Sequence, residues 1–356
     1  MNDKIKKIAF IIFLSGIGLL VAFFTVATIN LMPVDKDDDK TVEFTIPAGT
    51  GKGVIAEKLE KEELIKSSFF LKVYMYFANP NVFAGTYKMS KNMSALEILE
   101  KIENSESLEN ETTTLTFIEG KRLTNYVKQI SENFSYTEKE ILDKISDEDY
   151  LNTLITKYWF LSNDILNKDI YYALEGYIYP DTYAFKKTST IEEIIEKTLD
   201  NMNSKLTEYK EEIELLSFTP HQVLTLASIV ELEGASSNDR AGVAGVFMNR
   251  LNANMTLGSD VTTYYAVKKD FSVDLTRSDL NSCNAYNTRG TCVKGLPIGP
   301  IASASLESIV AAITPTKHDY FYFVADKNKQ TYFSVSGVEH QQTIKELKNK
   351  DLWFEY

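Results

Sequence analysis

The sequence predicts an α+β protein that carries a transmembrane helix near its N-terminus. Three observations support this class. Residues 8–32 contain no charged side chain, short strand patterns and helical patterns follow one another without a regular βαβ alternation, and 44% of all residues are apolar. A chain of 356 residues with this composition can bury a sizeable core in more than one domain. We therefore expect a membrane helix, a small mixed module and a larger α+β domain.

The N-terminal segment has the flanks of a membrane anchor. A bilayer core requires ~20 helical residues, which residues 8–32 supply. Lysines lie within residues 1–7 and an acidic linker occupies residues 33–40, so the positive-inside rule places the N-terminus in the cytoplasm. A cleaved signal peptide is the alternative, but its apolar core is typically about 7–15 residues long. We favour a single-pass anchor in the cell membrane, with the rest of the chain on the extracytoplasmic side.

Residues 41–111 form the predicted small module. Thr41–Ile46 alternates apolar and polar side chains like a strand, and a glycine-rich turn follows it. The expected order is strand, two helices, strand and helix, over Thr41–Ile46, Gly53–Ile65, Ser67–Ala78, Gly85–Ser90 and Met93–Asn104. A unit of this size suits a binding surface better than an elaborate catalytic site.

Two further segments complete the predicted organisation. Residues 112–173 begin with a strand–turn–helix pattern that weakly repeats the first module, and an acidic helical elaboration follows. Residues 174–356 form the larger domain. Thr219 begins its central helix with a capping box, Ser303 or Ser305 begins a later helix, and Tyr320–Ser336 alternates like a β-hairpin.

Charge and cysteine content exclude several classes of function. A net charge of −12 opposes nucleic-acid binding, because the phosphate backbone requires a basic surface. Cys283 and Cys292 have no paired histidine cluster, so the sequence predicts neither a metal site nor a cofactor. Outside the membrane these cysteines can form a disulfide, a possibility that the sequence leaves open.

Two glutamates interrupt the most apolar helical stretch, residues 226–251. On a helical wheel both Glu231 and Glu233 adjoin apolar neighbours, so periodicity alone does not rank them. Apolar surroundings favour the protonated form of a carboxylic acid, which can then donate a proton to a leaving group. The structural alternative is that Glu231 pairs with a buried base, Arg240 or Arg250.

Several separated motifs resemble the endolytic murein transglycosylase, or YceG-like, family. In chain order they read LEGYIYPDTY, IVELEGASSNDRAGVAGVFMNRL, GSDVTTYYAV, YNT, GLPIGPI, YFVAD, YFS and EH, and the similarity extends from about Thr41 to Lys350. The chain departs from the family at Val261, Ala285 and Ile298, where the family commonly has proline. These changes spare the polar residues and affect loop geometry more than chemistry.

The resemblance implies residue roles and a reaction. The family's catalytic glutamate follows Ile-Val, which implies Glu231 as a single carboxyl group that acts first as acid and then as base. Candidate substrate-binding residues are Asp260, Thr262, Tyr286, Asn287 and Thr288; the alternative is that Asn287 forms a turn and that Asp260 caps a helix or loop. The implied product of cleavage between N-acetylmuramic acid and N-acetylglucosamine is a 1,6-anhydro-muramyl end. The small module resembles a LysM-type glycan-binding domain.

The functional expectation is therefore a membrane-anchored lytic transglycosylase that cuts nascent peptidoglycan strands internally and so terminates their elongation. A non-catalytic peptidoglycan-binding scaffold of the wall-synthesis machinery is the alternative. A hydrolase that adds water to each cut is a third reading. By family analogy, the expected partners are glycan strands, the membrane and peptidoglycan synthases.

Overall fold

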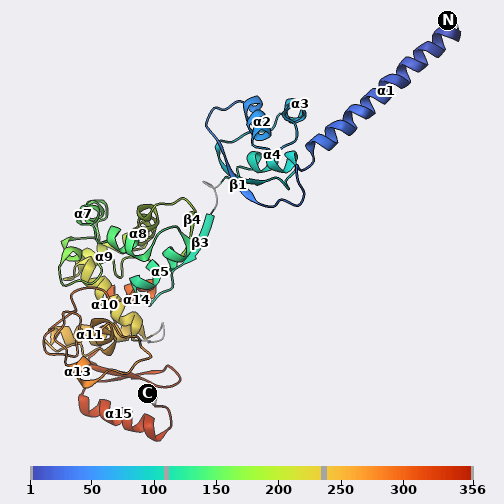
Figure 1. Cartoon of the computed structure of the whole chain (residues 1–356). Helices are drawn as coiled ribbons and strands as arrows, with labels where there is room; N and C mark the ends of the chain where they lie inside the picture. Colours follow the sequence, from blue (N-terminus) through green and yellow to red (C-terminus); the bar gives the residue numbers. More distant parts are fainter. Residues whose placement is uncertain (1–2, 108–111, 234–238, 354–356) are drawn as a thin grey trace. The chain divides into compact units, whose positions relative to one another are not determined.

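The computed structural model describes residues 3–107, 112–233 and 239–353. Helices and short strands occur together, and an apolar helix lies near the N-terminus (Figure 1). The mixed helix-and-sheet class predicted from the sequence is therefore confirmed.

The chain divides into two compact units, which we describe separately. One comprises residues 1–113 with 186–188, and the other comprises residues 114–185 with 189–356. The predicted domain boundaries stay predictions, and the boundary at residue 111 falls in residues 108–111, outside the described part of the chain.

The first helix, α1 (Asp3–Leu31), contains the predicted anchor. Phe10–Leu31 is long and apolar enough to cross a membrane, since its 22 residues extend for ~33 Å at the helical rise. Side chains along this stretch are largely exposed in the isolated chain, and Leu31 packs against the core of the following module. Its length, composition and exposure are compatible with a single-pass membrane anchor.

The module is built on a two-stranded antiparallel sheet. Strands β1 (Thr41–Ile46) and β2 (Gly85–Ser90) pair along their whole length, from Thr41 opposite Ser90 to Ile46 opposite Gly85. Helices α2 (Lys52–Lys61), α3 (Ser68–Ala78) and α4 (Ala95–Glu103) complete the module. The inward-facing side chains of the strands, among them Phe44 and Tyr87, form one core with the apolar faces of the helices.

The first part of the second unit contains a small two-stranded sheet and several helices. Its elements up to the central helix are β3 (Thr112–Thr116), α5 (Leu123–Asn133), α6 (Glu138–Lys144), α7 (Glu148–Lys157), the 3₁₀ helix η2 (Asn163–Leu166), β4 (Thr182–Lys186), α8 (Ile191–Thr207) and α9 (Lys210–Leu215). Strands β3 and β4 pair with each other although α5, α6 and α7 lie between them in the sequence.

The central helix α10 (Pro220–Leu232) carries the core of this unit. Thr219 and Gln222 form the predicted capping box, and every residue from Val223 to Val230 is buried. Helices α11 (Arg240–Asn252) and α14 (Leu306–Ile313) pack against α10, and Ser305, rather than Ser303, caps α14. A helix that is apolar on all sides needs neighbours on all sides, which explains its position.

The C-terminal part supplies the remaining elements. Short helices α12 (Asp260–Ala266) and α13 (Arg277–Leu280) precede a long loop, and the predicted hairpin forms from β5 (Tyr322–Ala325) and β6 (Thr331–Ser334). Helix α15 (Gly337–Asn349) packs on both strands of the hairpin. This arrangement brings residues near 250, 260, 322 and 340 to one side of the unit.

Candidate active site

The two glutamates of α10 have different surroundings. Glu231 Oε1 lies 3.1 Å from Arg240 Nη2, and its side chain is only 5% exposed. Its Oε2 accepts hydrogen bonds from Ser305 N (2.9 Å), Ser305 Oγ (2.5 Å) and Ser308 Oγ (2.8 Å). The premise that Glu231 lies among apolar side chains is therefore wrong, and the alternative of pairing with Arg240 is confirmed. Four hydrogen bonds from three residues, Arg240, Ser305 and Ser308, hold this carboxylate where α10, α11 and α14 meet.

Glu233 lies at the C-terminal cap of α10 and has few compensating contacts. Its Oε1 accepts a hydrogen bond of 2.5 Å from Ser259 Oγ. Burial, together with the carboxylate of Asp260, raises the pKa of Glu233 to about 7, although the Ser259 bond and the charges of Arg250 and Arg289 act in the opposite direction. A pKa in this range lets Glu233 donate and recover a proton near neutral pH, as general acid–base catalysis requires.

Glu233 faces an open polar cleft with a volume of about 460 Å³. Helix α11 and the turn before α12 form one side of the cleft, and the hairpin and α15 form the other. The lining residues are Glu233, Phe247, Arg250, Met255, Thr256, Leu257, Gly258, Ser259, Asp260, Arg289, Tyr322, Phe323, His340 and Gln341. Glu231 does not line this cleft.

Asp260 is the one predicted substrate-binding residue on the cleft surface. Its Oδ1 lies 2.9 Å from Arg289 Nε, and both side chains are about half exposed. The ion pair places a carboxylate and a guanidinium beside Glu233. Asp260 can thus face a developing positive charge. Arg289 offsets part of the Asp260 charge and so limits how far Asp260 raises the pKa of Glu233.

The other four predicted substrate-binding residues lie beneath the cleft and are 0–1% exposed. Thr262 and Thr288 share a hydroxyl hydrogen bond of 2.8 Å, and Thr288 Oγ1 accepts from Ser259 N at 3.2 Å. Thr262 also donates to Ser259 O. These threonines therefore fix the backbone of Ser259, whose side chain binds Glu233, and their positions give them a supporting role.

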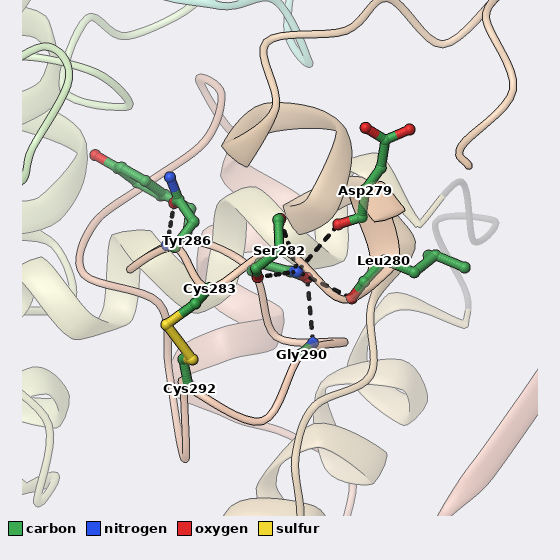
Figure 2. Close-up of a disulfide and its surroundings, with 9 residues drawn as sticks. Asp279, Leu280, Ser282, Cys283, Tyr286, Gly290 and Cys292 are labelled. Carbon is green, nitrogen blue, oxygen red and sulfur yellow. Dashed lines mark hydrogen bonds between the residues drawn. A yellow bond between two sulfur atoms is a disulfide. The ribbon is translucent and has the colours of Figure 1, made fainter. Parts of the chain in front are cut away.

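Tyr286 and Asn287 anchor the loop that carries Thr288. The Asn287 amide donates to the carbonyl groups of Leu280 (3.1 Å) and Ser282 (2.8 Å), and its oxygen accepts from Thr263 Oγ1 (2.7 Å). Figure 2 shows Leu280, Ser282 and Gly290 of this loop, whose backbone groups hydrogen-bond the Asn287 side chain. Tyr286 packs between other tyrosine rings in the interior.

A disulfide between Cys283 and Cys292 closes the same loop (Figure 2). The sequence left this bond open, and the structure forms it. Since Tyr286, Asn287 and Thr288 lie between the two cysteines, the covalent link and the Asn287 hydrogen bonds restrain the same segment.

The far wall of the cleft contains an imidazole that the sequence did not assign. His340 stacks on Tyr322 with ring centroids 5.4 Å apart, and the Arg250 guanidinium lies 5.2 Å from the centre of the same tyrosine ring. Burial, with the nearby Arg250 charge, lowers the pKa of His340 and so favours its neutral form. Its Nδ1 is buried and has no hydrogen-bond partner among the described residues. The signal in the sequence is the EH motif, Glu339–His340, to which the sequence alone gives no role.

A second interior carboxyl group, Glu175, lies away from the cleft. Its oxygens accept from Leu123 N (2.8 Å) and Tyr265 Oη (3.0 Å), and its exposure is 1%. Burial raises the pKa of Glu175 to about 7. Because Tyr265 belongs to α12, Glu175 ties the start of α5 to the helix whose first residue is Asp260.

No group of side chains suited to hold a metal ion occurs within the described ranges. The site offers a partly protonated carboxyl group, a carboxylate paired with arginine and a neutral imidazole around an open cleft. An α+β domain with this site has the construction of an acid–base enzyme that acts on an extended polar substrate.

Comparison with known proteins assigns the family. The chain belongs to the YceG-like family, whose model matches residues 44–346. It is 35% identical over 315 residues to a Bacillus subtilis protein named endolytic murein transglycosylase, covering 88% of this chain and 86% of that protein. A Streptococcus pneumoniae protein of the same name is 34% identical over 339 residues, and the match spans 91% of this chain and 61% of that relative.

Comparison with a solved structure supports the same family assignment. The crystal structure of a YceG-like protein from Listeria monocytogenes matches with a TM-score of 0.61 and 32% identity, covering 85% of this chain and 99% of that one. The predicted family is therefore confirmed from both sequence and structure.

Proposed function

We propose that this protein is a membrane-anchored endolytic transglycosylase that cleaves the glycan strands of peptidoglycan. The family, the names of its relatives and the apolar helix Phe10–Leu31 support this function. The single observation that carries the chemistry is the Glu233 carboxyl group, whose pKa is raised to about 7 beside an open cleft.

Glu233 is the acid and base of the proposed reaction. Its protonated oxygen donates to the oxygen between N-acetylmuramic acid and N-acetylglucosamine, and the bond from that oxygen to the muramyl C1 breaks. The resulting carboxylate then takes the proton from the muramyl C6 hydroxyl group, whose oxygen bonds to C1. The products are a 1,6-anhydro end and a free hydroxyl group, no water is consumed, and Glu233 regains its proton.

The neighbouring side chains support both steps. Ser259 fixes the carboxyl rotamer through its 2.5 Å hydrogen bond. The Asp260 carboxylate stabilises positive charge that develops at C1, and Arg289 orients it through their ion pair. Neutral His340 offers a hydrogen-bonding group to the sugar from the opposite wall.

The decisive experiment compares the two neighbouring glutamates. Glu233→Gln retains an acceptor for Ser259 but holds no exchangeable acid proton, so it should abolish release of anhydro-ended fragments from uncrosslinked strands. Glu231→Gln weakens the Arg240 pair and should lower the melting temperature, while the folded fraction still cleaves. Mass spectrometry of the fragments measures both and separates anhydro ends from hydrolysed ends by one water per cut.

The opposite result would restore the prediction from sequence. If folded Glu231→Gln protein is inactive and Glu233→Gln cleaves at the normal rate, Glu231 is the acid. If the unmodified protein binds strands without any cleavage, the non-catalytic scaffold is the better description.

The finer predictions belong to the same proposal. Residues 41–111 act as a LysM-like glycan-binding module, the N-terminus lies in the cytoplasm, and peptidoglycan synthases are partners whose strands the enzyme terminates. Protease protection in sealed vesicles tests the orientation, and limited proteolysis tests the boundaries at residues 40, 111 and 173.

A further inference from the structure

Helix α3 of the small module turns an aromatic face outward. Its exposed large side chains are Phe69 (59%), Tyr74 (40%), Tyr76 (81%) and Phe77 (80%). At about 100° per residue these four, with Phe70 and Val73, cover a continuous arc of roughly 160°. A helix on the surface of a water-soluble domain normally presents polar side chains over that arc.

The arrangement of α3 is fixed by its other face. Leu71 and Met75 are 1% and 3% exposed and belong to the core of the module, so the helix cannot rotate its aromatic side inward. Along the outer face, Phe69 contacts Phe70 edge-on with centroids 5.2 Å apart, and Tyr76 contacts Phe77 in the same way at 5.3 Å. The exposed rings therefore lie in two edge-on pairs on one side of the helix, and an exposed apolar face of this kind on a soluble protein marks an interaction surface.

The same face continues onto the predicted membrane helix. Phe70 lies 5.9 Å from Phe23 of α1, measured between ring centroids, and α1 and α3 pack against each other. Figure 1 shows α3 beside the C-terminal end of α1. Phe23 lies inside Phe10–Leu31, about two helical turns before its end. A bilayer that surrounds α1 thus reaches the level of Phe70.

We propose that the aromatic face of α3, formed by Phe69, Phe70, Val73, Tyr74, Tyr76 and Phe77, lies in the outer interface of the bilayer that α1 spans. This inference rests on the anchoring role of α1 in the proposed function. Aromatic side chains are favoured at the boundary between headgroups and acyl chains, and an amphipathic helix can lie in that boundary with its apolar face buried. The module is then held against the membrane surface at a second point.

A glycan is the competing occupant, because aromatic rings also stack on sugars. A sugar-binding face pairs its rings with hydrogen-bonding side chains for the hydroxyl groups, whereas this arc offers only the two tyrosine hydroxyls. Its continuity with α1 favours lipid.

The test uses the full chain reconstituted in vesicles of phosphatidylethanolamine and phosphatidylglycerol. The two native cysteines form a disulfide, so Phe77→Cys provides a single thiol for an environment-sensitive fluorophore. Val42→Cys is the matched control, since Val42 lies on β1 of the same module and is 42% exposed. We expect blue-shifted emission and quenching by spin-labelled lipid at position 77, and water-like emission without quenching at position 42.

Three outcomes overturn the inference and are distinguishable. Water-like emission at position 77 in chains that float with the vesicles rejects the interfacial face alone. Failure of the unlabelled chain to float rejects the anchor as well. Protection of position 77 by added glycan strands, without quenching by lipid, assigns the face to sugar binding. Cleavage of strands by the same preparation is measured separately and reports on the enzyme.

Discussion

Replacing Ser259 by alanine should move the pH dependence of cleavage upward. The Ser259 hydroxyl donates a 2.5 Å hydrogen bond to Glu233 and thereby favours the charged form of the carboxyl group. A hydrogen bond to a charged group contributes about 1.5–3 kcal/mol, which corresponds to about 1–2 pKa units. Water in the open cleft replaces part of this bond, so we expect the pKa of Glu233 to rise by about one unit.

The descending limb of the plot of kcat/KM against pH should therefore move to higher pH. Glu233 must be protonated for the first step, so kcat/KM falls as pH rises through its pKa of about 7. With the pKa one unit higher, the protonated fraction at pH 8 increases from ~10% to ~50%. Relative to its own plateau, the Ser259→Ala enzyme should therefore be about fivefold more active at pH 8. The plateau itself should be lower, because the carboxyl group is a weaker acid and its rotamer is less fixed.

Ser308→Ala provides the matched control. Ser308 is also buried and also donates to a glutamate, but its partner is Glu231. Initial rates of anhydro-end formation between pH 5 and 9, with melting curves at each pH, compare the variants. A descending limb that stays in place in Ser259→Ala and moves in Ser308→Ala would refute the assignment of Glu233 as the acid.

Three other predictions concern stability. Glu175 has a folded pKa of about 7 against ~4.3 in the unfolded chain, so the folded state binds the extra proton and its stability falls as pH rises through that window. Ionisation of Glu175 lowers the free energy of unfolding of the parent by about 3 kcal/mol between pH 5 and pH 8, and Glu175→Gln removes this loss. Denaturant midpoints at the two pH values should therefore differ less in the variant than in the parent; an unchanged difference contradicts this. Replacing Cys283 and Cys292 by serine should cost about 2–3 kcal/mol, because the bond closes a loop with a sequence separation of 9; a melting temperature that reduction does not alter argues against it. Gly176→Ala should prevent folding at physiological temperature, since a Cβ there meets Pro300 at 2.3 Å and Gly176 has a φ of +77°; soluble expression at the parent level would show otherwise.

Local patterns were sufficient for the elements that local forces determine. Thr41–Ile46 and Gly85–Ser90 are strands with the predicted ends, because alternation and glycine positions specify them. Thr219 caps α10 as predicted, since a capping box uses only residues three apart. The hairpin near Tyr322 also forms as predicted, because the alternation of side chains along its strands is a local pattern.

The different surroundings of the two glutamates could not follow from local pattern. Both lie in one apolar helix, and their difference comes from groups far along the chain. Ser305 and Ser308 satisfy Glu231 from α14, whereas Ser259 alone hydrogen-bonds Glu233. The protonation state of a carboxyl group depends on these tertiary neighbours, which periodicity does not encode.

The predicted substrate-binding residues show a related limit. Asp260, Asn287 and Thr288 are all polar residues near turns, and composition does not say which of them faces a ligand. Asn287 hydrogen-bonds the surrounding backbone and Thr288 supports Ser259, so both are inside, while Asp260 extends into the cleft. The backbone groups of a folded loop need polar side chains as hydrogen-bond partners, just as a ligand does. A polar residue near a turn can therefore serve either role.

The two walls of the cleft are made at different times. Ribosomes extend a chain from its N-terminus, and Glu233 emerges well before Tyr322 and His340. A nascent chain that ends at α14 already contains Glu233 but lacks the hairpin and α15, which form the opposite wall. The cleft is therefore complete once α15 has been synthesised and has packed on its hairpin.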